Sequence, residues 1–348
     1  MTQTRTQPFV PKYQQLFEYY KEQILKHTLK PGQRIDSINE LMQRHDVSRE
    51  TAKTVLKNLA DHGYVIQRAG KGSFVNKFPT RKKTWGLILP LYSIQYEELF
   101  QYIAHKATGM KRKVKHFVDY NNWKEEIRLV GQMIMQGYEA IIVVPTLDET
   151  KTASFYRRLS KHTTIVTLLD HTMTGSYFSY VIQNYNLGLL RGMRYLLQHS
   201  RGTIAFVRNE IWAERDMLQE SLEVVYKEIL TKERPEAPPV VIKQLDHINA
   251  ETLHKHNITG ILCMDDASAI RVMGKLSNEN VRIPDDIRLI SYGNTDLARY
   301  FTPGITSIDP HNAEMAEKIV SIIDRRLKGE NTDFCQYVVQ PEVVERET

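Results

Sequence analysis

The first 75 residues carry a pattern of apolar and polar positions that predicts three short helices. From about Pro11 to Leu25 the apolar residues recur at helical spacing and form one face, which predicts the first helix. Ser37 is followed three positions later by Glu40, the spacing of a capping box, so a second helix is expected to begin there. Ser48 lies where a third helix needs an N-cap.

The predicted third helix has one face that must pack and one that faces solvent. Its apolar stripe, at i, i+3, i+4 and i+7, consists of Ala52, Val55, Leu56 and Leu59. The opposite face therefore carries Arg49, Glu50, Lys53, Thr54 and Lys57 outward. That distribution is typical of a recognition helix, whose N-terminal residues reach base edges in the major groove. A hairpin with a Gly-x-Gly tip at Gly70 follows, so the region is predicted to be a winged helix-turn-helix.

From Trp85 onward the pattern changes to short apolar runs that alternate with amphipathic segments. The runs predict strands at Trp85–Leu89, Val114–Val118, Ala140–Val144, Thr164–Leu168, Tyr180–Ile182, Thr203–Val207, Val240–Ile242, Gly260–Cys263 and Leu289–Ser291. The segments between them predict helices at Glu97–Lys106, Trp123–Gln136, Leu187–His199, Met217–Ile229, Ala267–Leu276 and Ala313–Leu327. Nearly continuous apolar strands that alternate with helices indicate parallel sheets covered on both faces, so the expected fold class of this part is α/β.

The distribution of charge favours DNA binding by the N-terminal part. Residues 1–83 hold 16 Lys and Arg against 7 Asp and Glu, a net charge of +9, whereas the remaining 265 residues hold 31 against 34, a net charge of −3. A basic small domain joined to a slightly acidic large one is expected where only one end of the chain meets phosphate. The alternative, in which these lysines and arginines merely solvate an ordinary helical domain, leaves the helix-turn-helix and the wing unexplained.

Length and composition exclude several other classes of protein. At 348 residues the chain has room for two or three domains, and its 41% of hydrophobic residues is ordinary for a globular protein. No apolar run approaches the roughly 20 residues of a membrane helix, and the polar N-terminus is not a signal peptide, so a soluble, cytoplasmic protein is expected. The two cysteines and the group His247, His254 and His256 do not complete a metal-ligand set. Nor does any nucleotide-binding or nucleophile motif occur, so we expect no cofactor, no metal and no catalytic residue.

The N-terminal motifs resemble the DNA-binding domain of the GntR family of bacterial transcription regulators over residues 11–75. The resemblance implies that Arg49 contacts a base or phosphate, that Lys53 adds a basic contact, and that Gly70 lets the wing enter the minor groove. Asn39 replaces an arginine that is usual in the family, and Glu50 replaces a small or polar residue, so an unusual operator is expected. The residues expected to meet DNA are Arg34, Ser37, Asn39, Ser48, Arg49, Glu50, Thr51, Lys53, Arg68, Gly70 and Lys71.

The C-terminal motifs resemble the effector domains of the LacI/GalR family. The resemblance is closest over residues 260–266, 282–294 and 297–308, and a weaker similarity covers almost all of residues 84–340. It implies two Rossmann-like lobes joined by three crossovers, as in type I periplasmic-binding proteins. The expected domains are a winged helix-turn-helix at 1–75, a linker at 76–83, and a two-lobed domain at 84–348. Lobe 1 is expected at about 84–182 and 296–326, and lobe 2 at about 183–293 and 327–348.

In such a fold the ligand lies in the cleft between the lobes, at the carboxyl ends of the strands. The resemblance places Arg215 at the position of a sugar-binding arginine and Asp265 and Asp266 at an Asn-Asp position, although Leu218 stands where a glycine is usual. The remaining ligand-binding candidates are Tyr92, Ser93, Gln95, Tyr96, Asp170, His171, Trp212 and Asn294. For these residues turn capping, packing or fixing a hinge is the alternative role.

Together the two halves resemble the AraR-type regulators, which join a GntR reader to a LacI-type sensor. The resemblance implies a ligand-responsive bacterial transcription repressor that binds double-stranded operator DNA of palindromic sequence as a homodimer. A monosaccharide is the expected effector. Two alternatives stay open. In the first, the protein is still a DNA-binding regulator, but its sensor is degenerate or binds a purine or a sugar phosphate. In the second, the large domain is an enzyme on a Rossmann-like scaffold.

Overall fold

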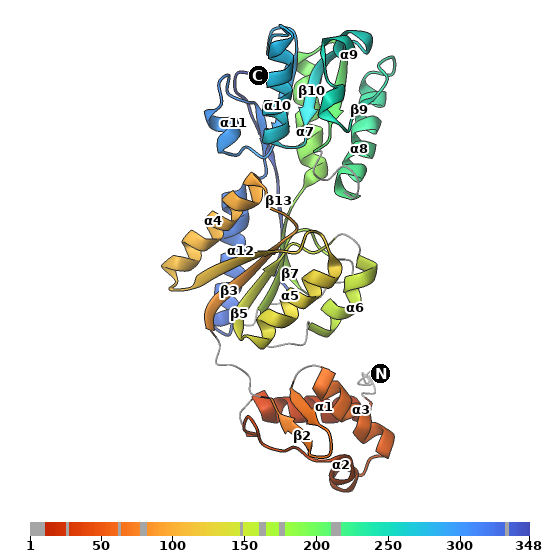
Figure 1. The fold of residues 1–348 in the computed structure, drawn as a ribbon, viewed down its shortest axis with the longest axis vertical. Coiled ribbons are helices and arrows are strands. Elements are labelled where there is room, and N and C mark those ends of the chain that lie inside the picture. Colours follow the sequence, from red (N-terminus) through yellow and green to blue (C-terminus); the bar gives the residue numbers. More distant parts are fainter. Residues whose placement is uncertain are drawn as a thin grey trace, which may run out of the picture. The chain divides into compact units, whose positions relative to one another are not determined.

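The computed structural model describes residues 11–25, 28–61, 64–76, 82–146, 149–159, 165–173, 178–209, 217–330 and 334–348. These residues fall into two compact units, of which the first reaches Lys82 and the second holds most of residues 83–348. Figure 1 labels their helices and strands in chain order. None of the helices in the described ranges combines the length and the apolar character that crossing a bilayer requires.

The first unit contains three helices and a hairpin. The helices are α1 (Lys12–Leu25), α2 (Ile38–His45) and α3 (Arg49–Asp61), and the antiparallel strands are β1 (Val65–Arg68) and β2 (Gly72–Val75). Tyr13, which the helical pattern placed on the apolar face of the first helix, is 39% exposed. The buried core consists of Leu16, Phe17, Tyr20, Ile24, Ile35, Leu41, Ala52, Val55, Leu56, Leu59, Tyr64, Val65 and Val75. The predicted order of helices and hairpin is confirmed.

The second unit contains two six-stranded sheets, which define two lobes. The sheet of lobe 1 has the order β13-β7-β6-β5-β3-β4, and the sheet of lobe 2 has the order β14-β12-β11-β10-β8-β9. The strands of lobe 1 are β3 (Lys82–Leu89), β4 (Lys113–Val118), β5 (Tyr138–Val143), β6 (Ile165–Asp170), β7 (Ser179–Gln183) and β13 (Gln336–Val339). The strands of lobe 2 are β8 (Thr203–Val207), β9 (Val240–Ile242), β10 (Ile258–Cys263), β11 (Arg288–Tyr292), β12 (Ser307–Asp309) and β14 (Glu342–Val344). Their described pairings are parallel except for β12 with β14.

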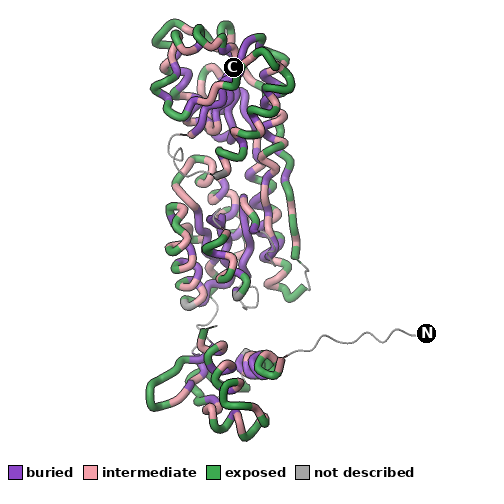
Figure 2. The backbone as a smooth tube through the Cα atoms, turned by 90° about the vertical axis from the view of Figure 1, so that its right-hand side faces the viewer, coloured by how far each residue is buried: buried purple, intermediate pink, exposed green. Residues whose placement is uncertain are grey.

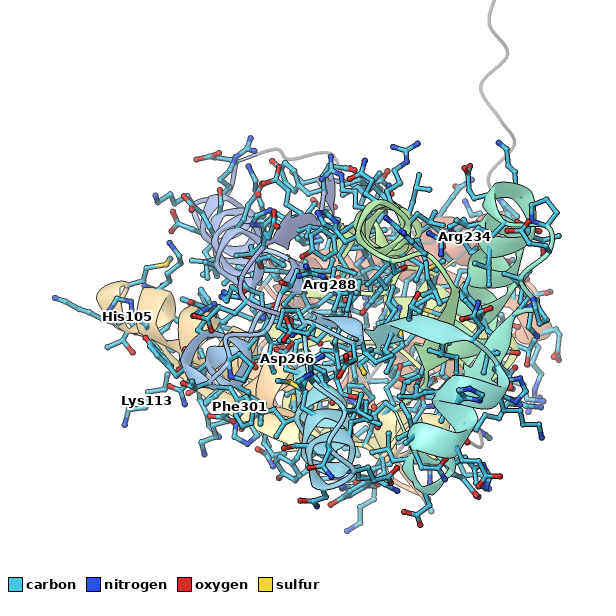
Figure 3. All side chains as sticks on the ribbon, turned by 90° about the horizontal axis from the view of Figure 1, so that it is seen from above. His105, Lys113, Arg234, Asp266, Arg288 and Phe301 are labelled. Atoms are coloured by element: carbon cyan, nitrogen blue, oxygen red, sulfur yellow. The ribbon has the colours of Figure 1, made fainter. Side chains whose placement is uncertain are left out.

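Helices cover both faces of each sheet, as the apolar strands predict. In lobe 1, α4 (Ile94–Gly109) and α12 (Asn312–Leu327) pack together against one face, and α5 (Trp123–Met135) and α6 (Glu149–Leu159) lie on the other (Figure 1). In lobe 2, α7 (Tyr185–His199) and α8 (Met217–Glu233) cover one face. The opposite face carries a 3₁₀ turn (Leu245–His247), α9 (Ala250–Lys255), α10 (Asp266–Asn278) and α11 (Asp296–Tyr300). Residues of the strands are mostly buried (Figure 2). The exposed side chains of His105 and Lys113 project outward from lobe 1 (Figure 3).

The chain passes between the lobes three times, as the resemblance implied. The passages lie between β7 and α7, between β12 and α12, and between β13 and β14. Two C-terminal strands differ from the expected lobe boundaries. β12 pairs with β11 and β14 in lobe 2, and β13 pairs with β7 in lobe 1, so each lies in the lobe opposite to the one expected. These strands have only three or four residues, too few for their periodicity to indicate a sheet partner.

Candidate functional site

The exposed face of α3 carries the side chains that were predicted to read DNA. Arg49, Glu50 and Lys53 are exposed, and the opposite face of the helix is buried. The hydroxyl of Ser48 accepts a hydrogen bond from the backbone N–H of Thr51 at 3.2 Å and lies 2.9 Å from the Thr51 hydroxyl. Ser48 is therefore the N-cap that the sequence indicated, and it fixes the first turn of α3.

A capping box orders the start of α2. The side chain of Ser37 accepts from the backbone N–H of Glu40 at 3.3 Å, and the Glu40 carboxylate accepts from the backbone N–H of Ser37 at 2.6 Å. The hydrogen bonds from Ser37 hold the pKa of Glu40 below its usual value. Arg34 lies 3.4 Å from the same carboxylate, and Asn39 is exposed on the first turn. Both side chains are accessible to a ligand on this surface.

The hairpin between β1 and β2 has glycines with positive φ at its tip, as the predicted wing requires. Gly70 and Gly72 have φ values of +68° and +100°, a region in which side chains are strained. The guanidinium of Arg68 lies 5.0 Å from the centre of the Phe74 ring, which holds it beside the tip. Lys71 is exposed at the tip. The first unit thus presents cationic groups on α3, before α2 and on the hairpin.

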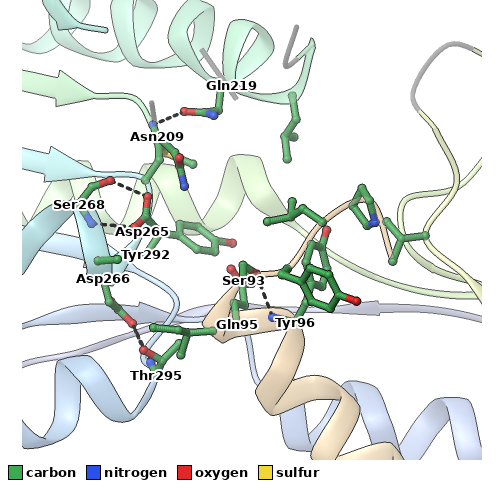
Figure 4. Close-up of a pocket in the computed structure, with 18 of the residues that line it drawn as sticks. Ser93, Gln95, Tyr96, Asn209, Gln219, Asp265, Asp266, Ser268, Tyr292 and Thr295 are labelled. Atoms are coloured by element: carbon green, nitrogen blue, oxygen red, sulfur yellow. Dashed lines mark hydrogen bonds between the residues drawn. The ribbon is translucent and has the colours of Figure 1, made fainter. Parts of the chain in front are cut away.

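A cavity of about 320 Å³ in the second unit lies where strands of both lobes end. Of the predicted ligand-binding residues, the cavity is lined by Tyr92, Ser93, Gln95, Tyr96, His171, Asp265 and Asp266. Ser93 also caps α4, because its hydroxyl accepts from the backbone N–H of Tyr96 at 3.1 Å (Figure 4). Trp212 and Arg215, by contrast, lie outside the described residues.

Asp170 does not line the cavity but supports residues that do. It is buried, and its carboxylate accepts from the hydroxyls of Tyr96 and Tyr185 at 2.8 Å and from the amide of Gln183 at 2.8 Å. The hydroxyl of Tyr292 in lobe 2 donates to the Gln183 side chain at 2.6 Å. Burial raises the pKa of Tyr185, so this phenol remains a hydrogen-bond donor. A continuous polar network therefore joins the two lobes behind the cavity wall.

The adjacent carboxylates Asp265 and Asp266 are both engaged within the protein. Asp265 caps α10 and accepts from the backbone N–H and the hydroxyl of Ser268, each at 2.7 Å (Figure 4). Asp266 is buried and accepts from the backbone N–H and hydroxyl of Thr295, each at 2.8 Å. Its other oxygen accepts from the hydroxyls of Ser291 and Ser307. Burial raises the pKa of Asp266, while these hydrogen bonds act in the opposite direction.

Asn294 also lies away from the cavity lining. Its amide donates to the Asp309 carboxylate at 2.8 Å and accepts from the guanidinium of Arg346 at 2.6 Å. This residue is buried and has a φ of +48° in the loop after β11. These contacts fit the hinge role that was the alternative to ligand contact.

The sequence analysis missed several side chains that line the cavity: Asn121, Tyr185, Asn209, Gln219, Arg271 and Tyr292. Asn121 and Asn209 follow the carboxyl ends of strands, so the rule that selected Asp170 also applies to them. Gln219 accepts from the backbone N–H of Asn209 at 2.7 Å (Figure 4), a contact between distant segments that periodicity does not reveal. Tyr292 is the last residue of the buried strand β11, so the same carboxyl-end rule applies to it as well.

Comparison with known proteins finds two matching family models, one in each part of the chain. Residues 12–75 match the gntR family of bacterial regulatory proteins, and residues 193–348 match the periplasmic binding protein-like domain. A relative from Halalkalibacterium halodurans, the arabinose metabolism transcriptional repressor, is 22% identical over an alignment of 366 positions that covers 96% of each chain.

Solved structures share the fold of the second unit. A LacI family transcriptional regulator from Enterococcus faecium with bound ribose has a TM-score of 0.62 and 18% identity, covering 76% of this chain and 97% of its own. A periplasmic binding protein/LacI transcriptional regulator from Alkaliphilus metalliredigens, complexed with D-xylulofuranose, has a TM-score of 0.61 and 18% identity over 77% of this chain and 99% of its own. The chain thus contains a region that matches the gntR family, followed by a region that matches the periplasmic binding protein-like domain, and the relatives named above are transcription regulators.

Proposed function

We propose that this chain, in which a gntR-family domain precedes a periplasmic binding protein-like domain, is a repressor whose operator affinity is controlled by a monosaccharide. The observation that carries the proposal is the pairing of an exposed recognition helix with a polar cavity between two lobes. The name of the relative, an arabinose metabolism repressor, supports the same conclusion.

The first unit supplies the groups that DNA recognition needs. Arg49, Glu50 and Lys53 project from the start of α3, the part of a recognition helix that reaches base edges. We assign base contacts to these residues with Ser48 and Thr51, and backbone contacts to Arg34, Ser37, Asn39, Arg68, Gly70 and Lys71. Phosphate contacts position the protein, whereas base contacts select the sequence.

The lining of the cavity favours a small neutral ligand with several hydroxyls. Among the described lining residues Arg271 is the single Lys or Arg side chain, and it is accompanied by two carboxylates. This balance disfavours a sugar phosphate, which needs a surplus of cations. The amides of Gln95, Asn209 and Gln219 offer both donors and acceptors to hydroxyls. A volume of about 320 Å³ suits one sugar ring, and solved structures of the same fold hold ribose and D-xylulofuranose.

We infer that the active form is a homodimer on a palindromic operator. One recognition helix reads one half-site, and two-fold symmetry of the protein requires the same symmetry in the DNA. We assign the dimer contact to the second unit, which leaves the cationic groups of the first unit available for DNA.

Control by the ligand requires that it bind the two lobe arrangements with different affinity. The hydrogen bond between Gln183 in lobe 1 and Tyr292 in lobe 2 lies behind the cavity, with Asp170 and Tyr96 connected to it. A sugar that contacts Tyr96 therefore acts on a network shared by both lobes. We propose that the sugar stabilises the arrangement with low operator affinity.

A thermal-shift screen tests the proposal, because a ligand that binds only the folded state raises the melting temperature. The panel contains pentoses, hexoses, their phosphates and purines. We expect a shift with a neutral pentose, and the same shift in Arg49→Ala, which keeps the cavity. Gln95→Ala, which removes a cavity amide from the first turn of α4, should lose most of the shift. It should still bind the operator as tightly as the wild type. A shift with phosphates or purines alone would refute the sugar assignment.

A further inference from the structure

Two carboxylic acids are buried in lobe 1 beside the cavity. Asp119 follows β4 and is 1% exposed, and Glu126 lies on α5 and is fully buried. An ionised carboxylate at such a position costs several kcal/mol unless a partner compensates its charge. The pair therefore needs either a proton or a cation.

The hydrogen bonds of the pair leave one oxygen atom without a partner. Glu126 accepts from the backbone N–H of Thr146 at 2.7 Å and from the hydroxyl of Tyr156 at 2.5 Å, so both of its oxygens are used. One oxygen of Asp119 accepts from the backbone N–H of Asn121 at 2.8 Å. The other is buried and has no hydrogen-bond partner among the described residues.

Within the described residues, neither acid forms an ion pair with a Lys, Arg or His side chain. The charged groups that face Asp119 are the carboxylates of Glu126 and Glu125 on α5. The hydroxyl of Tyr156 on α6 also lies nearby, where it donates a hydrogen bond to Glu126. Burial, with Glu126 next in effect, raises the pKa of Asp119 to about 7. Burial also raises the pKa of Glu126, which its hydrogen bonds from Tyr156 and Thr146 oppose. Because Glu126 accepts two hydrogen bonds, it is the better site for the negative charge of the pair, and Asp119 is the better site for the proton.

The pair holds two loops that form one wall of the cavity. Asn121, whose backbone N–H is bound by Asp119, lines the cavity, and the residue before Thr146 is the lining residue Pro145. Tyr120 and Asn121 have φ values of +55° and +54°, a conformation that needs local support. The Asp119 side chain gives that support by accepting the Asn121 N–H bond.

We propose that Asp119 is a proton site, so that the buried pair Asp119–Glu126 holds one proton and ties the stability of the cavity wall to pH. Loss of that proton leaves two neighbouring buried charges, which favours opening of the loop after β4 toward water. If the proposed function holds, the cavity should therefore bind its sugar more weakly at pH 8 than at pH 6. The effect on stability does not depend on any ligand.

The sign of the pH dependence follows from linkage. The folded pKa of Asp119 lies above the value of about 3.9 for an unfolded aspartate, so the folded protein binds the proton more tightly. The resulting stability is complete below the unfolded pKa and is lost as the pH rises through about 7. For one such proton the folding equilibrium constant falls about tenfold between pH 6 and pH 8.

The test compares unfolding of wild-type protein and Asp119→Asn across pH 6 to 8. Asparagine keeps an acceptor for the Asn121 N–H and carries no charge, so we expect the wild type to lose about tenfold in folding equilibrium constant relative to the variant. Asp246→Asn is the matched control, since the Asp246 side chain is 97% exposed, and its profile should follow the wild type. Parallel profiles of wild type and Asp119→Asn would overturn the proton site.

Two further measurements keep the proposal open to refutation. Infrared spectra of the wild type should show the band of a buried protonated carboxylic acid at pH 6 that disappears by pH 8. A spectrum without that band at pH 6 refutes the proton site even if Asp119→Asn fails to fold. A wild-type melting temperature at pH 8 that rises with sodium, potassium, magnesium or calcium chloride but not with choline chloride would assign the site to a cation instead. If no sugar binds at either pH, the proposed function fails while the stability test still applies.

Discussion

Replacing Asp266 with alanine separates a structural role of this carboxylate from direct contact with the ligand. The substitution removes the acceptor of the buried Thr295 N–H and of the hydroxyls of Thr295, Ser291 and Ser307. The hydroxyls can turn to other partners, but the backbone N–H cannot. One unsatisfied buried donor costs about 1–3 kcal/mol, and each lost charge-assisted hydrogen bond adds to that cost. Relief of the buried charge offsets part of it, and we expect a net loss of about 2–4 kcal/mol.

Asparagine at the same position is expected to cost less. Its oxygen can keep both Thr295 donors, and its NH₂ group can donate to the hydroxyls of Ser291 and Ser307, which then act as acceptors. We therefore expect Asp266→Asn to lose about 0.5–1.5 kcal/mol.

The assay is urea-induced unfolding followed by circular dichroism, with Asp246→Ala as the exposed control. Unchanged stability of Asp266→Ala together with abolished sugar binding would refute the structural role and restore the direct contact that the sequence indicated.

Three further predictions follow from named contacts. Ser37→Ala removes half of the α2 capping box and should destabilise the first unit by about 1 kcal/mol, measured by urea unfolding of that transition; an unchanged midpoint contradicts it. Gly188→Ala would place a methyl 2.9 Å from the Tyr292 hydroxyl, so we expect a loss of about 1–3 kcal/mol and weaker sugar binding. Gly274→Ala, in the interior of α10, meets nothing within 4 Å and should stabilise the protein by about 0.5–1 kcal/mol without affecting sugar binding. Lys71→Ala should lower the slope of log Kd against log salt for operator binding by about 1, and an unchanged slope would exclude a phosphate contact.

The elements that the sequence predicted well are those with long, regular periodicity. The stripe of Ala52, Val55 and Leu59 packs in α3 as expected, and all the predicted parallel strands are present. The short strands β12, β13 and β14 and the helices α6, α9 and α11 were not predicted. In the elements of three to six residues there are too few repeats to separate a regular element from a loop, and the sheet partner of a short strand is set by contacts far along the chain. The helix α6 has 11 residues and was missed although that length is sufficient for a helical pattern.

The residues of the candidate site were predicted only in part, and element length does not explain the misses. The rule that ligands lie at the carboxyl ends of strands identifies Tyr92, Tyr96 and Asp265, which line the cavity. It does not distinguish a side chain that faces the cavity from one that faces its neighbours, because that depends on hydrogen-bond partners. Asp170 ends the strand β6 and Asn294 lies in the loop after β11, so both are at the correct ends of strands, yet their polar atoms are bound by other side chains.

The most direct test of the account measures operator affinity of the full chain with and without the sugar found by the thermal-shift screen. The operator is selected from random duplexes by the protein, and binding is followed by fluorescence anisotropy at fixed salt, with Arg49→Ala as the control that should bind about 10-fold or more weakly. We expect the sugar to raise the Kd of the wild type for the operator, and Gln95→Ala to lose that response. A Kd that does not change at saturating sugar would contradict the claim that the cavity controls DNA binding.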